Sequence, residues 1–150
     1  MADMSDNLND VLRYYKLIVK EDLDAVLGSR FIKKSKIIDY PLFKLLLNRI
    51  FNTFIKFLFL SNYNDFTNAF KMYKRKTVLR ILPVVSENFN VFLEIPLKII
   101  IRKYNYKIIP ISWKNRKKGT SKFKIVELGS MYLFTMLYYL IEKILINKKK

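Results

Sequence analysis

In the ten residues from Trp113 to Lys122, WKNRKKGTSK, four cations lie within three positions of Gly119, one of only three glycines in the chain. These cations are Arg116, Lys117, Lys118 and Lys122. A glycine lets backbone N–H groups turn toward an anion, and a planar guanidinium and mobile ammonium groups offer complementary contacts to phosphate. The segment therefore predicts a phosphate-binding loop. The alternative is a solvated basic loop, because runs of like charge are usually exposed.

The composition limits the chemistry available to the chain. Cysteine and histidine are both absent, which excludes disulfides, thiol or imidazole catalysis and the usual zinc ligands. Carboxylates, hydroxyls, lysine, arginine and a hard metal ion held by oxygen remain. The net charge of +17 predicts an anionic partner, which could be nucleic acid, an anionic membrane surface or a phosphorylated substrate. An A/T-rich coding sequence would also account for part of this charge, since Lys, Asn, Ile, Tyr and Phe are all abundant.

The elements that must position such a loop follow from periodicity. A chain of 150 residues with 51% hydrophobic content predicts one folded domain. Apolar spacing and turn signals predict helices over 7–20, from Pro41 through 58, and over 76–82, 91–103 and 124–146, and strands over 23–28, 67–73 and 106–113. This alternation predicts an α/β fold. Pro110 favours an edge position or a bulge for the last strand.

Two helices carry polar residues at regular spacing. In the helix that begins at Pro41, a polar stripe at i+4 spacing predicts an amphipathic core helix whose apolar side chains pack inward. The stripe consists of Lys44, Asn48, Asn52 and Lys56. In the helix over 91–103, Glu94 and Lys98 are spaced for an i,i+4 ion pair, so we leave Glu94 out of the candidate site.

The final helix has a charge-free middle of 14 residues, 128–141, which is shorter than the roughly 20 residues needed to cross a bilayer. The sequence leaves two alternatives, a core helix or a helix in the membrane interface, and we favour the interface. Lys148, Lys149 and Lys150 suit both the helix dipole and anionic headgroups. Residues 1–20 carry no signal-peptide pattern, so we expect a cytoplasmic protein that is peripheral at the cytoplasmic membrane face.

Four segments in order resemble the landmarks of a known enzyme family. They are ADMSD at 2–6, LGSRF at 27–31, NDFTNAFK at 64–71 and the cationic loop at 113–122. Together they resemble glycosyltransferase family 2, in particular its dolichol-phosphate mannosyltransferase-like branch, which uses polyprenyl phosphates.

The resemblance implies a partial GT-A, or nucleotide-diphospho-sugar transferase, fold. Residues 1–123 would form the C-terminal part of the catalytic domain, and 124–150 a C-terminal amphipathic or apolar helix with a basic tail. The family's N-terminal βαβ half has no counterpart in this sequence, which implies a missing companion half. Asp3 matches the second aspartate of the family's Asp-x-Asp metal motif, where Met1 replaces the first. A divalent ion, Mg or Mn, is therefore expected at Asp3, with a helix-capping carboxylate as the alternative.

The other site residues follow from the same resemblance. Arg30 resembles the phosphate-contacting arginine of the family's Gly-Ser-Arg element, and Arg116 and Lys122 resemble its late cationic loop. Asp65 matches the aspartate of the acceptor-side motif, and we take it as the catalytic candidate. Lys71 stands where the family commonly has an arginine, so a point charge replaces a bidentate phosphate ligand. The alternatives are a solvated cation at Arg30 and a turn-forming side chain at Asp65.

The function implied by the resemblance is inverting transfer of a hexose from a nucleotide-diphospho-sugar to a polyprenyl phosphate at the membrane surface. Because an acceptor phosphate is already anionic, no strong general base is needed, and Asp65 could orient groups instead of removing a proton. We expect the chain to be truncated and inactive by itself. The alternative from another class is a small basic nucleic-acid-binding protein, which +17 and Tyr73-Lys74-Arg75 favour; the buried α/β pattern argues against it, and we expect no nucleic acid partner.

Overall fold

The computed structural model describes residues 6, 7, 9–115 and 125–148. Within these residues the helices and strands alternate as an α/β chain. Their order is α1 (Asn9–Lys20), β1 (Ala25–Ser29), β2 (Lys36–Ile38), α2 (Leu42–Phe59), β3 (Lys71–Tyr73), α3 (Arg75–Ile81), α4 (Val91–Ile101), β4 (Tyr106–Pro110), β5 (Ser112–Lys114) and α5 (Ile125–Lys148).

The central sheet is mixed, with strand order β3-β1-β4. Strand β1 runs antiparallel to β3 and parallel to β4, with Ala25 opposite Tyr106 and Ser29 opposite Pro110. A second, two-stranded sheet pairs β2 with β5 in parallel. All five residues of β1 are buried, as expected for a central strand that is covered on both faces. The carboxyl ends of β1 and β4 therefore meet at one edge.

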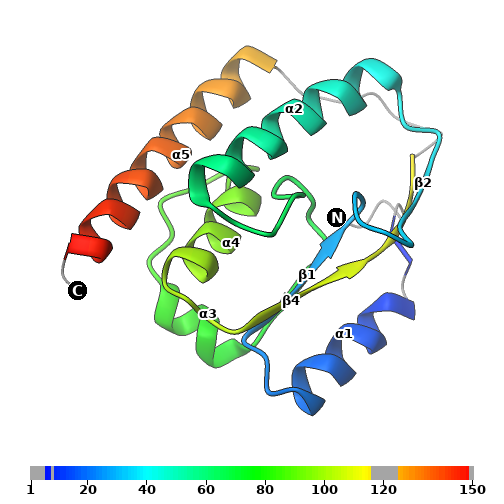
Figure 1. Cartoon of the computed structure of the whole chain (residues 1–150), viewed down its shortest axis with the longest axis horizontal. Coiled ribbons are helices and arrows are strands. Elements are labelled where there is room, and N and C mark those ends of the chain that lie inside the picture. Colours follow the sequence, from blue (N-terminus) through cyan, green and yellow to red (C-terminus); the bar gives the residue numbers. More distant parts are fainter. Residues whose placement is uncertain (1–5, 8, 116–124, 149–150) are drawn as a thin grey trace.

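Helices cover both faces of the central sheet (Figure 1). Helix α1 packs on one face through Tyr14 and Ile18, and α4 lies on the other with α2 and α5 around it. The approach of α1 requires a glycine in β1, because a Cβ on Gly28 would lie 2.2 Å from the Tyr14 hydroxyl and 2.8 Å from the Phe70 carbonyl oxygen. Neither group can move away freely, so the Leu-Gly-Ser sequence is set by packing as well as by any chemistry.

The structure confirms the alternation of elements and most of the predicted helices. Two strand predictions need correction, and one strand was missed. The strand predicted over 67–73 is limited to β3, because the preceding residues form a loop held by side-chain hydrogen bonds. The strand predicted over 106–113 is divided into β4 and β5, which belong to different sheets. Strand β2 was not predicted at all. Pro110 ends β4, an edge strand, as expected.

The prediction for α2 was wrong in orientation. Its polar residues Asn48 and Asn52 face inward, and Asn52 is fully buried. Its apolar side chains, predicted to pack in the core, are largely exposed. The periodicity of the sequence identified a polar and an apolar face of α2 correctly. It could not predict which face packs against the rest of the protein, because that depends on buried hydrogen-bond partners in another loop.

Candidate functional site

An ion pair between Arg30 and Asp65 lies at the carboxyl end of β1. The Arg30 Nε donates to Asp65 Oδ2 at 2.9 Å and Nη2 donates to Oδ1 at 2.7 Å. The backbone N–H of Arg30 donates to the same Oδ2 at 2.8 Å. The Asp65 side chain is fully buried, and that of Arg30 is 7% exposed. Burial alone would lower the pKa of Arg30, but the hydrogen bonds and charge of Asp65 outweigh it and raise that pKa.

Aromatic rings enclose the Arg30 guanidinium. The rings of Phe31, Tyr40 and Trp113 have their centroids 5.2, 5.7 and 5.7 Å from its central carbon. Tyr40 and Trp113 also contact each other edge to face at 4.8 Å. Such rings attract a cation electrostatically. The charge of Arg30 is therefore held by a carboxylate on one side and by aromatic faces on the others.

The polar residues of α2 reach the same pair from its far side. The Thr67 hydroxyl accepts hydrogen bonds from Asn48 at 2.8 Å and Asn52 at 3.2 Å, and lies 3.5 Å from Arg30 Nη2. The amide oxygen of Asn52 accepts from the backbone N–H of Phe66 at 2.6 Å. The loop that carries Asp65 is thus fixed to α2 by buried, satisfied hydrogen bonds.

Further hydrogen bonds tie this loop to β1. Ser29 Oγ donates to Asn64 Oδ1 at 2.6 Å, and Asn64 Nδ2 donates to the Phe31 carbonyl at 3.0 Å. The Gly28 carbonyl accepts from the Tyr63 hydroxyl and from Asn68 Nδ2, both at 2.9 Å. Burial, then the charge of Asp65, raises the pKa of Tyr63, which keeps its hydroxyl a donor. These contacts fix the loop that carries Asp65 against the end of β1, next to Arg30.

Lys71, at the start of β3, is partly buried with its ammonium directed at backbone carbonyls. Its Nζ donates to Phe66 O and Phe92 O, both at 2.8 Å, and to Asn68 O. Phe92 O lies four residues before Pro96, which has no N–H to donate within α4. The ammonium therefore replaces the missing helical donor. Burial lowers the pKa of Lys71 to about 7, although the charge of Asp65 opposes this shift.

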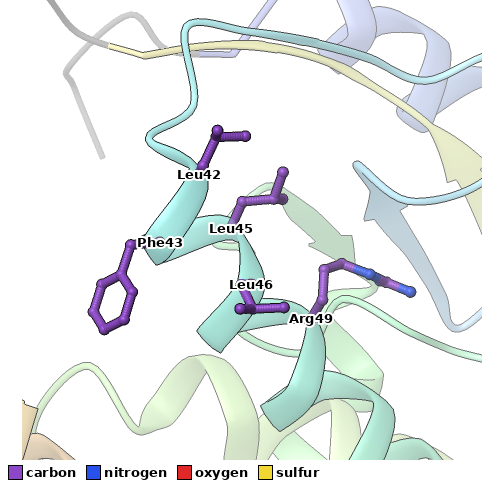
Figure 2. A pocket seen from close by; sticks show the side chains of 5 residues that line it. All are labelled: Leu42, Phe43, Leu45, Leu46 and Arg49. Carbon is purple, nitrogen blue, oxygen red and sulfur yellow. The ribbon is translucent and has the colours of Figure 1, made fainter.

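A shallow apolar hollow lies on the first turns of α2, beside this cluster (Figure 2). Its volume is about 460 Å³, and it is lined by Leu42, Phe43, Leu45, Leu46 and Arg49. The Arg49 guanidinium lies 4.3 Å from the ring centroid of Phe31, the residue after Arg30, and its Nη1 donates to Asn64 O at 3.4 Å. The hollow thus has an apolar lining and one cation, Arg49, near the Arg30–Asp65 pair.

Of the residues predicted for the site, the structure brings Arg30 and Asp65 into direct contact and attaches Lys71 to the loop that carries Asp65. Asp3, Arg116 and Lys122 lie outside the described residues. In the described part of the chain no group of three or more acidic side chains gathers to hold a metal ion. Both oxygens of Asp65 are taken up by Arg30, so expectations for a divalent ion rest on Asp3.

Sequence reasoning missed the polar layer behind the pair and the aromatic rings around it. The i+4 stripe of α2 was the available signal for Asn48 and Asn52, had its inward direction been known. Nothing in the sequence pointed to Tyr40, which only the fold brings to Trp113. Tyr73, whose position beside two cations favoured the nucleic-acid alternative, instead packs against the core and is partly buried.

Comparison with curated proteins finds distant similarity. No protein-family model matches the chain. The chain is similar to a polyprenol monophosphomannose synthase from Mycolicibacterium smegmatis, with 25% identity over 118 residues that cover 71% of this chain and 44% of that protein. The chain therefore spans less than half the length of this curated relative.

Proposed function

We propose that the chain is the acceptor-side part of an inverting glycosyltransferase of family 2, with a partial GT-A fold. The enzyme would transfer a hexose from a nucleotide-diphospho-sugar to a polyprenyl phosphate at the cytoplasmic face of the membrane. The similarity to a polyprenol monophosphomannose synthase supports the donor and acceptor classes. The mixed α/β architecture is compatible with the fold.

The Arg30–Asp65 pair is the observation that carries the proposal. A guanidinium has five N–H donors. Asp65 takes up Nε and one N–H of Nη2, while Thr67 faces Nη2 at 3.5 Å. The two N–H groups of Nη1 take no part in these bonds. The carboxylate thus fixes the guanidinium plane, and we assign the N–H groups that Asp65 does not take up to the acceptor phosphate.

In this mechanism Asp65 is a positioning residue. A phosphate oxygen of the acceptor attacks the anomeric carbon of the sugar, and the bond from that carbon to the nucleoside diphosphate breaks with its electron pair leaving on the diphosphate. Arg30 orients the attacking phosphate, and we assign the departing diphosphate to Arg116 and Lys122. Lys71, whose protons are bound to carbonyls, contributes through charge. A divalent ion at Asp3 would supply further charge stabilisation.

We expect the 150-residue chain alone to give no turnover, because the groups that we assign to it are mainly those of the acceptor side. Measurable transfer of labelled hexose by the purified chain would contradict this part of the proposal. Acceptor binding is tested separately by calorimetric titration of the chain with farnesyl phosphate and with farnesol, which lacks the phosphate. The proposal predicts at least ~10-fold tighter binding of farnesyl phosphate. Equal affinities would refute a phosphate site.

A further inference from the structure

Helix α2 turns an apolar face away from the protein. Seven large side chains along it are between 42% and 82% exposed. They are Leu42, Phe43, Leu46, Leu47, Ile50, Phe54 and Phe57. A contiguous apolar surface of this extent on a folded domain marks a contact with something other than water.

Helix α5 has a matching stripe. One side packs on the core through Tyr132, Met136 and Tyr139. The opposite side exposes seven large side chains, between 45% and 60% each: Leu133, Phe134, Leu137, Tyr138, Ile141, Ile144 and Leu145. The stretch Gly129–Lys148 is long and apolar enough to cross a membrane, and 22% of its most apolar window is buried.

The two stripes lie on neighbouring helices. The ring of Phe51 in α2 packs against Tyr132 in α5 at 5.5 Å, and Lys143 Nζ donates to the Leu58 carbonyl at 3.3 Å. Both helices lie on the side of the central sheet opposite α1 (Figure 1). We call the fourteen exposed side chains of the two stripes the α2–α5 face.

The charged residues of the two helices that form the α2–α5 face are mostly cations. Helix α2 contains Lys44, Arg49 and Lys56 and no acidic residue. Between 129 and 148 of α5 the single acidic residue is Glu142, which is paired with Arg102 at 2.9 Å. Apolar side chains flanked by cations, with aromatic residues among them, are the pattern of helices that lie in the interface of an anionic membrane.

We propose that the α2–α5 face docks the protein on a lipid bilayer with anionic headgroups, α2 and α5 lying together in the interface. The inference rests on the proposed function in one respect, since a polyprenyl phosphate acceptor resides in the membrane. Asn48 and Asn52, on the inner side of α2, bind Thr67 beside Arg30. Docking through the outer side of α2 would therefore place the Arg30 pair one helix thickness, roughly 10 Å, from the headgroups.

Two features favour lying in the interface over other arrangements. The hydroxyl of Tyr139 donates to the buried Glu94 at 2.6 Å, so α5 is fixed to α4 and cannot cross the bilayer while the fold is intact. A symmetric dimer through the same face would bring the cations of α2 in two copies together without any acidic partner, which like-charge repulsion disfavours. Anionic lipid removes that repulsion.

The absence of cysteine allows a direct test with single labelled positions. Phe57→Cys and Ile141→Cys place an environment-sensitive nitrobenzoxadiazole dye on the α2–α5 face, and Leu12→Cys places it on α1 as a control. Leu12 is 64% exposed, close to the 70% and 59% of the other two. With phosphatidylcholine–phosphatidylglycerol vesicles, the dye at 57 and 141 should shift to the blue and brighten, and the dye at 12 should not change.

Vesicle flotation supplies the second measurement. Phe43→Glu/Phe57→Glu should weaken vesicle binding at least ~10-fold, whereas the matched α1 variant Leu12→Glu/Val19→Glu should bind like the wild type. Wild-type binding should also fall with added salt or with phosphatidylcholine alone. No dye shift at 57 and 141, or a concentration-dependent dimer that vesicles do not dissolve, would overturn the proposal. No sugar donor or acceptor is present, so failure of transfer and failure of docking are separate results.

Discussion

Two buried ion pairs in this protein differ in how many donors they leave free. In the first pair, Lys98 donates to Glu94 at 3.1 Å, to Ile81 O at 2.8 Å and to Pro83 O. The ammonium thus uses all three of its protons. In the second, at the end of β1, Arg30 binds Asp65 and keeps Nη1 out of those bonds.

The partners of each acid differ in the same way. Glu94 accepts from the backbone N–H groups of Val85 and Ser86 and from Tyr139, at 2.8, 2.6 and 2.6 Å. It joins α4 to α5 and to the segment before α4. Asp65 is paired with Arg30. This pair lies at the carboxyl ends of the parallel strands β1 and β4, where ligands usually bind in α/β proteins. We call an ion pair saturated when all N–H groups of its cation are hydrogen-bonded within the protein, and unsaturated when some are not. A saturated pair stabilises the fold, and an unsaturated pair can bind a ligand.

The largest expected effect is on the saturated pair. Glu94→Gln leaves the Lys98 ammonium buried without its counter-charge, and we expect it to lower the free energy of unfolding by about 3–5 kcal/mol. Urea denaturation followed by circular dichroism measures this. Glu142→Gln, which removes a more exposed pair with Arg102, is the control and should cost about 0–1 kcal/mol. Equal losses of unfolding free energy in the two variants would mean that the Glu94–Lys98 pair stabilises the fold no more than an exposed pair does.

The Glu94–Lys98 pair should also make the stability of the protein depend on pH. Burial opposes ionisation of Glu94, but hydrogen bonds from Ser86, Tyr139, Val85 and Lys98 outweigh it and lower its pKa. A lowered pKa contributes stability above the unfolded-state pKa, and this is lost as pH falls through the folded-state value. The wild type should therefore lose more stability than Glu94→Gln between neutral pH and about pH 3. Parallel pH profiles of the two proteins would contradict the shift.

A smaller loss of stability is expected at the unsaturated pair. Arg30→Lys keeps the charge but cannot make both bonds of the fork to Asp65. We expect a loss of about 2–3 kcal/mol in urea denaturation. Because Nη1 is also lost, farnesyl phosphate binding should fall even under conditions where the variant is fully folded. A variant that loses stability and keeps binding would make this pair structural, like the first.

The smallest expected change in stability concerns Lys71, whose role we place between those of the saturated and the unsaturated ion pair. If its ammonium replaces the N–H that Pro96 lacks, Pro96→Ala should partly compensate for its loss by supplying a donor to Phe92 O. In a double-mutant cycle, Lys71→Met should therefore cost about 1 kcal/mol less in the Pro96→Ala background than in the wild type. Additive free energies would assign Lys71 no such role.

The sequence predicted the parts of the fold that local periodicity determines. Helices α1, α4 and α5 lie close to their predicted ranges, and Glu94 and Lys98 form the expected i,i+4 pair. The landmarks at 27–31 and 64–71 also pointed to residues that the fold brings into contact, Arg30 and Asp65. Their roles in phosphate binding and catalysis remain predictions.

The features that the sequence did not predict depend on distant partners. Helix α2 faces the core with Asn52 because Thr67 and Phe66, in a later loop, supply its hydrogen bonds. Ile55 and Phe59 also face the core, whereas apolar side chains on the outer side, such as Phe54 and Phe57, stay exposed, which a binary pattern cannot indicate. Strand β2 is three residues long and exists through its pairing with β5, a contact too far along the chain for local propensity to reveal.

The most direct test of the central claim is a calorimetric titration of farnesyl phosphate into three proteins, each fully folded by circular dichroism: wild type, Arg30→Lys and Glu94→Gln. The account predicts that Arg30→Lys weakens binding at least ~10-fold and that Glu94→Gln binds as the wild type does. Unchanged affinity in Arg30→Lys, or an equal loss in both variants, would contradict the claim that Asp65 holds Arg30 in place to bind phosphate.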